Sequence, residues 1–423
     1  GTQVTPSTLT VGPSGSATLE FNSVSSTTTA PIAAGSIAAG GPITVNVNSG
    51  TLAPGNSYPL FSWSAGAAPE VSLGVLNGFI GTLTTNGGNT IVLNVTATAY
   101  KWSGGNNGNW DTTTANNWQQ NGGPVVYGVN GPGPAIFDDT ASGNTSITIN
   151  GPVSATLVTF NNVNSNYSVA ASGANNLGGS TTVLQAGSGT TTLSGGANTY
   201  TGVTTVSGGT LSVGVLANGG SPSDIGQSGS GAANLVLNGG RLQYTGSGAS
   251  IDRLFTLGTS GGTIDDSGTG ALVFNNTGAL GYSGNGPRTL TLAGADTDNN
   301  TLAAVLANNG GATSLIKNGA GKWILTGNNT HSGVTTIAGG TLQVGAAGGT
   351  GALGTGNVIN DGVLNFNRTG TLTVSGIVSG TGSVINDGTG TVILAADNTY
   401  SGGTTINAGT LQVGNGGGTG KLN

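Results

Sequence analysis

Cysteine and methionine are both missing from the 423-residue chain. The lack of cysteine excludes disulfide bonds and thiol chemistry, and a chain without oxidisable sulfur suits exposure outside the cell. Charged residues are also scarce, at 5% of the sequence against about a quarter in typical domains. The eight Lys and Arg residues form no cluster, so neither nucleic acid nor an acidic membrane surface is an expected partner.

Helical patterning is missing as well. No stretch of a dozen residues has apolar side chains at spacings of three and four, because Gly and Asn interrupt nearly every segment. The uncharged stretches are rich in Gly, Asn and Thr, so we expect no membrane insertion by a helix of this chain. The sequence starts at Gly1 without a signal peptide, which predicts either a processed chain or a fragment.

Short runs of Val, Ile, Leu and Thr are abundant instead. They alternate with a period of two and are bounded by Gly-Gly, Asn-Gly or Asp-Gly, which is typical of β-strands and turns. Clear examples are residues 43–47, 91–95, 235–237 and 392–394. Gly contributes 83 residues without the strict period of collagen. The sequence therefore predicts an all-β protein.

One pattern, N-T-[YH]-[ST]-G-[VG]-T-T-[VI]-x-x-G-T-L-x-V-G, occurs three times, at residues 198–214, 329–345 and 398–414. A lead-in that ends in a strand precedes each copy, at residues 187–195, 319–327 and 388–396. Two short strands around a Gly-containing corner cannot stand alone as a ribbon. Stacking successive coils would close the backbone ladder and form a continuous core. We therefore expect a β-solenoid with about 20 to 25 residues per coil.

The three copies and their lead-ins resemble the autotransporter-associated β-strand repeat, also called the passenger-associated transport repeat. Proteins with this repeat are large bacterial surface or secreted proteins. The resemblance implies an elongated, right-handed parallel β-helix and an extracellular or cell-surface location.

Three regions are expected along the chain, and the first two are defined by their resemblance to modules of similar bacterial surface proteins. Residues 1–99 have the character of a β-rich end-piece that closes a preceding module, residues 100–140 form a Trp-containing opening of the solenoid, and residues 141–423 form the repeat-bearing solenoid. The last copy runs to within nine residues of Asn423 without a closing cap. Because open solenoid ends usually need capping, we expect one period of a longer array or end-to-end stacking with copies of the same chain.

Three tryptophans, Trp102, Trp110 and Trp118, are spaced eight residues apart in the opening region. Their aromatic faces could stack on sugar rings. They could instead seal the end of the solenoid, with each indole N–H bonded to a backbone acceptor. We favour the sealing role and keep glycan binding as the alternative.

Groups that could support catalysis or bind a metal have structural explanations. His331, the only histidine, occupies the position of Tyr200 and Tyr400 in the other copies, so a catalytic triad or a metal site around it is not expected. Residues 296–300, Asp-Thr-Asp-Asn-Asn, resemble a calcium loop but lack its central Gly and distal Glu. We expect a solvated turn there.

The acid pairs Asp138-Asp139 and Asp265-Asp266 are adjacent, and neighbouring residues of a strand point to opposite faces. We therefore expect each pair to serve turns or strand ends. A carbohydrate-active β-helix would need two carboxylates at a defined separation, and the best candidate set is Arg253, Asp265, Asp266 and Arg288. We expect Arg241 and Arg253 to pair with nearby acids or to lie in solvent.

The sequence thus predicts a structural or adhesive protein of a bacterial cell surface or extracellular filament, and not an enzyme. Its partners would be copies of itself and surface glycans, and it would need no cofactor or metal. The alternatives are a carbohydrate-active β-helix enzyme and an adhesin that binds glycans through the Trp segment.

Overall fold

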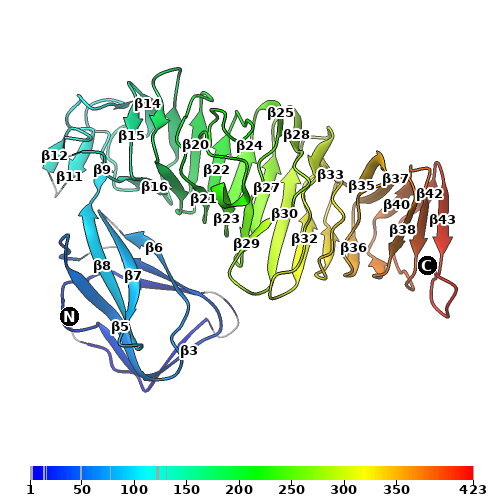
Figure 1. Cartoon of the computed structure of the whole chain (residues 1–423), viewed down its shortest axis with the longest axis horizontal. Coiled ribbons are helices and arrows are strands. Elements are labelled where there is room, and N and C mark those ends of the chain that lie inside the picture. The colour runs from blue at the N-terminus through cyan, green and yellow to red at the C-terminus, as the bar shows by residue number, and fades with distance from the viewer. Residues whose placement is uncertain are drawn as a thin grey trace. The chain divides into compact units, whose positions relative to one another are not determined.

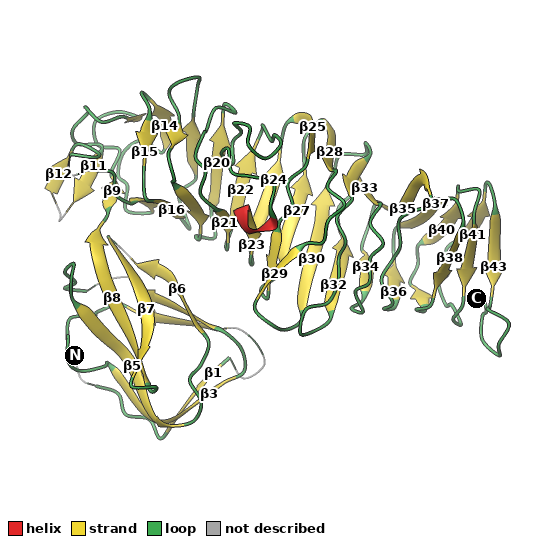
Figure 2. Ribbon diagram, in the orientation of Figure 1, coloured by secondary structure: helices red, strands yellow, loops and turns green. Residues whose placement is uncertain are grey.

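The computed structural model describes residues 3–12, 15, 17–47, 50–76, 78–120, 123–129 and 131–422. Within these residues the secondary structure is strands β1 to β43 and one short 3-10 helix, η1, at Ala232–Asn234 (Figure 2). The chain divides into two compact units. The first comprises Gly1–Ile147 and Ala155–Ser165, and the second comprises Thr148–Ser154 and Asn166–Asn423.

The N-terminal part of the first unit contains two sheets. The larger is ordered β1-β3-β5-β8-β7 and mixes parallel with antiparallel pairs. The smaller is ordered β2-β4-β6 and is parallel. Their core includes Ile43, Val45, Phe61 and Leu93, all fully buried. The strands are β1 Thr8–Val11, β2 Ala17–Phe21, β3 Ile32–Ala39, β4 Ile43–Val47, β5 Ser57–Ala65, β6 Val71–Leu76, β7 Phe79–Asn86 and β8 Thr90–Thr98.

The rest of the first unit is a Trp-rich layer. Strand β11 is antiparallel to both β9 and β12, whereas β13 runs parallel to β9 and β16. Both antiparallel and parallel pairing therefore occur within this layer. The strands are β9 Tyr100–Trp102, β10 Asn109–Trp110, β11 Trp118–Gln120, β12 Gly123–Val125, β13 Ala135–Asp138 and β16 Leu157–Asn161; β14 Ser146–Ile149 overlaps the boundary between the units.

The second unit is a β-solenoid, as the sequence predicts, and its strands form parallel ladders (Figure 1). The first ladder is β17 Tyr167–Ala170, β20 Thr190–Ser194, β22 Thr210–Val213, β24 Arg241–Tyr244, β27 Gly262–Asp266, β30 Arg288–Gly294, β32 Thr313–Lys317, β34 Thr335–Ile337, β36 Val358–Asn360 and β39 Val378–Ser379. The second is β19 Thr182–Gln185, β21 Thr204–Val206, β23 Leu235–Leu237, β26 Thr256–Gly258 and β29 Gly281–Ser283.

Two further ladders complete the C-terminal coils. The third is β25 Ser247–Ile251, β28 Gly270–Phe274, β31 Asn300–Leu302, β33 Lys322–Leu325, β35 Thr341–Gly348, β37 Val363–Arg368, β40 Ser383–Asn386 and β42 Thr404–Ile406. The fourth is β38 Thr371–Val374, β41 Thr391–Leu394 and β43 Thr410–Val413. A short pair, β15 Val153–Ser154 and β18 Leu177–Gly178, is also parallel.

The register of strand pairing gives the number of residues in each coil. Thr190 pairs with Thr210, 20 residues later, and Thr210 pairs with Arg241, 31 residues later. The expected 20 to 25 residues therefore fit the first of these coils, while the second is longer because residues 214–234, including η1, are inserted between strands. The inward column Leu211, Leu242, Ile264 and Leu292 is in register and fully buried. Each such side chain contributes roughly 1.5 to 3 kcal/mol of hydrophobic stabilisation.

The three repeat copies lie on different ladders. In the first copy, β21 lies in the second ladder and β22 in the first ladder. In the second copy, β34 lies in the first ladder and β35 in the third ladder. In the third copy, β42 lies in the third ladder and β43 in the fourth ladder. In every copy the segment that starts with Asn-Thr forms the corner before these strands and contains no strand itself. The repeat is thus a unit of coil construction that is independent of the face on which it lies.

Candidate functional site

The three tryptophans form one aromatic cluster. Trp102, Trp110 and Trp118 are fully buried, and their rings pack against one another and against Tyr127 and Phe137 at centroid distances of 4.8 to 5.8 Å. The indole Nε1 of Trp102 donates a hydrogen bond to the backbone oxygen of Asn144 at 2.7 Å. The Nε1 atoms of Trp110 and Trp118 have no hydrogen-bond partner among the described residues, so the expectation that each indole N–H bonds to a backbone acceptor is wrong for these two. Because no indole face is exposed, the cluster offers no stacking surface to a sugar, and the sealing role stays a prediction.

The asparagine that opens each repeat joins three successive coils. Its Oδ1 accepts a hydrogen bond from a backbone N–H of the preceding coil, at 3.1 Å for Asn198, 2.8 Å for Asn329 and 2.9 Å for Asn398. Its Nδ2 donates to a backbone oxygen of the following coil, at 3.3, 2.9 and 3.2 Å. All three side chains are buried. Since an unpaired buried amide or carbonyl is costly, this asparagine satisfies the backbone where strand pairing stops.

The aromatic position two residues later fills the corner. The hydroxyl groups of Tyr200 and Tyr400 hydrogen-bond to the Oγ1 atoms of Thr204 and Thr404 at 2.8 and 2.6 Å. His331 is fully buried at the same position, but its two ring nitrogens have no hydrogen-bond partner in the described part of the chain. Burial lowers the pKa of His331, so the ring is neutral near pH 7. This environment agrees with the structural role expected for His331.

Two glycines of the motif are required by close backbone contact. A Cβ atom at Gly333 or Gly402 would overlap the backbone oxygen of Thr313 or Gly382 in the preceding coil. The later glycine, such as Gly340, has a φ of +62° and a similar overlap, and only glycine adopts this combination without strain. The motif glycines therefore set the coil spacing.

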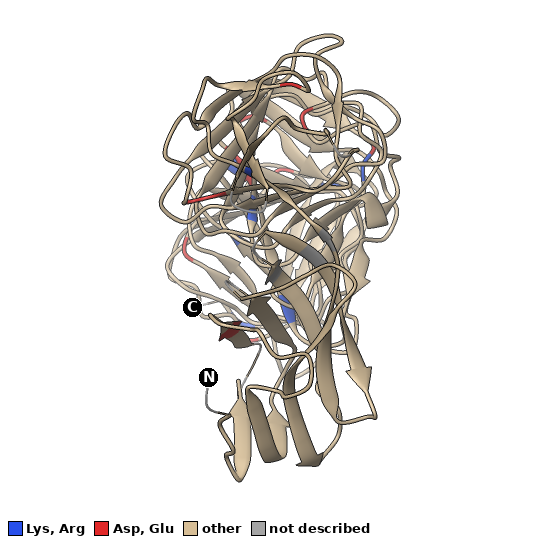
Figure 3. Cartoon of the chain, turned by 90° about the vertical axis from the view of Figure 1, so that its left-hand side faces the viewer, with Lys and Arg blue, Asp and Glu red and all other residues tan. Residues whose placement is uncertain are grey.

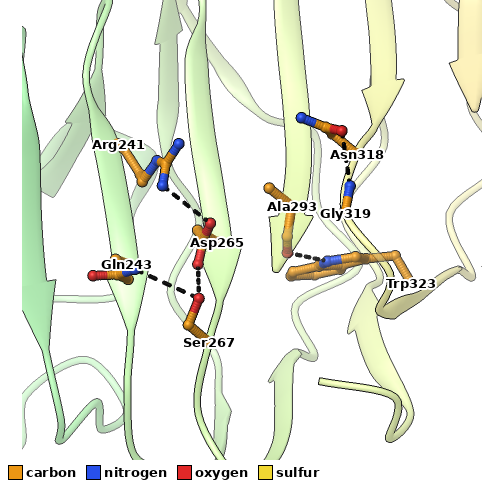
Figure 4. Close-up of polar contacts among 8 residues, drawn as sticks. All are labelled: Arg241, Gln243, Asp265, Ser267, Ala293, Asn318, Gly319 and Trp323. Carbon is orange, nitrogen blue, oxygen red and sulfur yellow. Dashed lines mark hydrogen bonds and ion pairs between the residues drawn. The ribbon is translucent and has the colours of Figure 1, made fainter. Parts of the chain in front are cut away.

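The acids of β27 do not form one site. Asp265 contacts the guanidinium of Arg241 at 3.4 Å and accepts a hydrogen bond from the Ser267 hydroxyl at 2.5 Å (Figure 4). Asp266 instead accepts backbone N–H groups of Gly268 and Leu272, at 3.0 and 3.1 Å. Burial is the main reason why the pKa of Asp266 is raised to about 6. The expectation that the two carboxylates point to different surroundings is consistent with this geometry.

The arginines of the same region bind backbone oxygens. Arg253 is 2% exposed, and its guanidinium donates to the oxygens of Ala217 and Gly226, at 2.8 and 2.9 Å, and to Ser228. The expectation that Arg253 pairs with an acid or lies in solvent is therefore wrong. Arg288 is also buried and donates to five backbone oxygens, those of Leu257, Ser283, Gly284, Gly286 and Asn309. These cations support the turns around them.

The remaining acids are engaged in local backbone bonding. Asp138 pairs with Lys101 at 2.9 Å, and Asp139 accepts the backbone N–H groups of Val163, Asn164 and Ser165. Asp296 accepts the N–H of Asp298 at 2.9 Å within its own turn, in keeping with the expected turn. No group of three His, Cys, Asp or Glu side chains among the described residues could hold a metal ion.

Charge is sparse in the structure as it is in the sequence. Figure 3 shows Lys, Arg, Asp and Glu as a few scattered segments of the ribbon. Within the described residues, no helix has the length and apolar character needed to span a membrane.

Some residues that stabilise the fold through hydrogen bonds to the backbone were not predicted from the sequence. The coil-bridging role of Asn198, Asn329 and Asn398 was signalled by their recurrence in every copy. Asp224 had no such signal, although its buried carboxylate accepts the N–H groups of Gly196, Gly214 and Val215. Desolvation is the main reason why its pKa is raised.

Comparison with known proteins supports this view of the repeat. The family model of the passenger-associated transport repeat matches residues 183–213, 315–344 and 384–413, which overlap all three copies and confirm the resemblance. The adhesin BmaC autotransporter of Brucella suis biovar 1 (strain 1330) is 42% identical over 173 residues, which are 40% of this chain and 5% of that protein. No solved structure matches the chain. The expected cell-surface or extracellular location is confirmed.

Proposed function

We propose that this chain, with its three passenger-associated transport repeats, is a structural and adhesive part of a bacterial surface protein. The observation that carries the proposal is that the motif residues serve coil stacking. The asparagine bridges coils, the aromatic residue fills a corner and the glycines set the spacing. An adhesive role is supported by the related Brucella protein, which is named an adhesin. The function is therefore mechanical: a scaffold that presents its surface outside the cell.

Adhesion can be tested with beads that carry the purified chain. We expect these beads to be retained on mammalian cell monolayers more strongly than bare beads. A Gly402→Ala variant, in which the last coils are displaced, is matched with Gly403→Ala, because a Cβ at Gly403 meets no atom within 4 Å. Retention by neither the native chain nor the Gly403→Ala variant would refute the adhesive role. Retention by those two with loss in Gly402→Ala would assign adhesion to the C-terminal coils.

A non-catalytic role is part of the proposal. It is supported by the separate surroundings of Asp265 and Asp266 and by the backbone bonding of Arg253 and Arg288. The competing carbohydrate-active enzyme predicts release of reducing ends from a bacterial or host polysaccharide. Such release, if abolished by Asp265→Asn, would overturn the non-catalytic proposal.

We further propose that the apolar side chains of the last coil are covered by more β-structure, either a continuation of the same array or a second copy of the chain stacked end to end. Ile406 and Val413 are 52% and 42% exposed, whereas the equivalent Ile337 and Val344 of the second copy are fully buried. These side chains occupy core positions of the solenoid, and covering them would extend its apolar core. The outer edges of β42 and β43 would then continue the third and fourth ladders.

Sedimentation velocity across a range of concentrations tests this stacking. We expect self-association that is lost in an Ile406→Asp, Val413→Asp variant and retained in Thr405→Asp, which changes an exposed residue of the same strand. A native chain that sediments as a monomer at every concentration would refute stacking between copies. Glycan binding, the other expected interaction, would be detected on a glycan array.

A further inference from the structure

The turn between β32 and β33 contains an unusual asparagine. Asn318 and Gly319 are exposed, and the backbone N–H of Gly319 donates to Oδ1 of the Asn318 side chain at 2.8 Å (Figure 4). The φ of Gly319 is +79°, a conformation that glycine adopts without steric cost. The nitrogen of the peptide bond thus lies beside the carboxamide of the preceding residue.

A buried cation contacts the oxygen of the same peptide bond. Lys317 is fully buried and follows Leu292 in register along the inward column. Its Nζ donates to the backbone oxygens of Asn318, Gly319 and Gly339 at 3.1, 2.8 and 3.1 Å. A cation at the Asn318 oxygen withdraws electron density from the peptide bond and stabilises negative charge on the nitrogen of Gly319.

We propose that Asn318 is a site of spontaneous covalent modification through a cyclic imide. The Gly319 nitrogen loses its proton to solvent and attacks Cγ of Asn318, so that an N–Cγ bond forms. The Cγ–Nδ2 bond breaks and the nitrogen leaves as ammonia. Water then opens the ring at one of its two carbonyl carbons and yields aspartate or isoaspartate. No oxidant or reductant takes part.

The isoaspartate product places a carboxylate beside Lys317. Ring opening at the main-chain carbonyl converts the oxygen that Lys317 already contacts into part of a carboxylate. The ammonium, which now has backbone oxygens as its hydrogen-bond partners, would gain a counter-ion. Burial lowers the pKa of Lys317 to about 8, and an adjacent negative charge would raise that pKa again.

Two other Asn-Gly pairs, Asn218-Gly219 and Asn238-Gly239, are held away from this geometry. The N–H of Gly219 donates to Asp252 at 2.7 Å, and Oδ1 of Asn218 accepts from the backbone N–H of Asp252 at 2.9 Å. Oδ1 of Asn238 likewise accepts from the N–H of Ser260 at 3.1 Å, and the N–H of Gly239 donates to the oxygen of Gly261 at 2.7 Å. At both sites two hydrogen bonds must break before attack, so they serve as internal controls.

The test follows deamidation of the folded chain at 37 °C and pH 7.5 by peptide mass spectrometry, which detects the gain of about one mass unit and separates aspartate from isoaspartate. Because opening two hydrogen bonds lowers the reactive population, we expect modification of Asn318 to be faster than that of Asn218 and Asn238 by at least about tenfold. In denaturant the three rates should converge.

A Lys317→Met variant tests whether the ammonium of Lys317 accelerates the reaction at Asn318. It keeps an apolar stem in the core, and circular dichroism would verify its fold. We expect a slower reaction at Asn318 with unchanged rates at Asn218 and Asn238. The proposal is overturned if Asn318 in the folded native chain reacts no faster than the two controls. An unchanged rate at Asn318 in a folded Lys317→Met variant would remove Lys317 from the mechanism.

Discussion

Replacing His331 with tyrosine should stabilise the second repeat. In the other two copies a tyrosine hydroxyl hydrogen-bonds to the threonine four residues later, and Thr335 occupies that position here. A Cβ on Gly354 would press on the ring of His331, as one on Gly226 would press on Tyr200. Both rings therefore lie beneath a glycine of the following coil, and this packing favours accommodation of a tyrosine.

The expected gain follows from the hydrogen bonds involved. The new bond contributes about 1 kcal/mol, and removal of buried ring nitrogens without partners relieves a further cost, so we expect about 1 to 3 kcal/mol in total. Because repeat arrays unfold locally as well as globally, amide hydrogen exchange around residues 329–337 is the suitable assay. Protection there should rise about tenfold or more in His331→Tyr, since about 1.4 kcal/mol corresponds to tenfold.

The same substitution should change the response to acid. Burial lowers the pKa of His331 in the folded chain, so below the ordinary value of about 6.5 the unfolded chain binds a proton that the folded chain does not. Stability of the native protein then falls with decreasing pH by up to about 1.4 kcal/mol per unit. His331→Tyr should lose this contribution. Lower protection in His331→Tyr than in the native chain, or equal acid sensitivity of the two, would refute the reasoning; Tyr200→His should show the reverse changes.

Three further substitutions test the structure. Asn329→Leu leaves a backbone N–H and a backbone oxygen unpaired and should cost about 2 to 4 kcal/mol, measured by denaturant unfolding; a cost below 0.5 kcal/mol would contradict the bridging role. Gly402→Ala should destabilise the last coils by more than about 2 kcal/mol, whereas Gly403→Ala should be tolerated, and equal protease resistance of the two would exclude the overlap argument. Because the pKa of Asp266 is raised to about 6, its contribution to stability is present below pH 3.8 and is lost as the pH rises through about 6. The free energy of unfolding of the native protein should therefore fall by roughly 3 kcal/mol between pH 4 and 7 because of this group, and that fall should be absent in Asp266→Asn. Identical pH profiles of the two proteins would refute this.

The strands and the repeat could be predicted because their signals are local. Residues 43–47 and 235–237 form β4 and β23 with the same bounds, and residues 392–394 lie within β41. Alternation with a period of two decides which side chains are buried, and recurrence distinguishes the motif from low complexity. The structural role of His331 was predictable for the same reason, since the other copies have tyrosine at its position.

The partners of isolated polar residues could not be predicted, because they depend on which loop lies one coil away. Ala217 and Gly226, which bind the Arg253 guanidinium, lie in the insertion that lengthens one coil. The length of that coil is set by a loop without a periodic pattern, so the sequence offers no register for this contact. Arg253 therefore has the sequence signature of a solvated or ion-paired residue although it is buried.

The changing position of the repeat on the solenoid bears on its role. If the motif formed a binding surface, its copies should recur on one face, so that neighbouring copies could act together. Instead β21 and β22, β34 and β35, and β42 and β43 belong to successive pairs of ladders. What stays constant is the bonding between coils, with Asn198, Asn329 and Asn398 each contacting the coil before and the coil after. Selection for such bonding explains both the strict motif and its irregular spacing, because a corner can be built on any face.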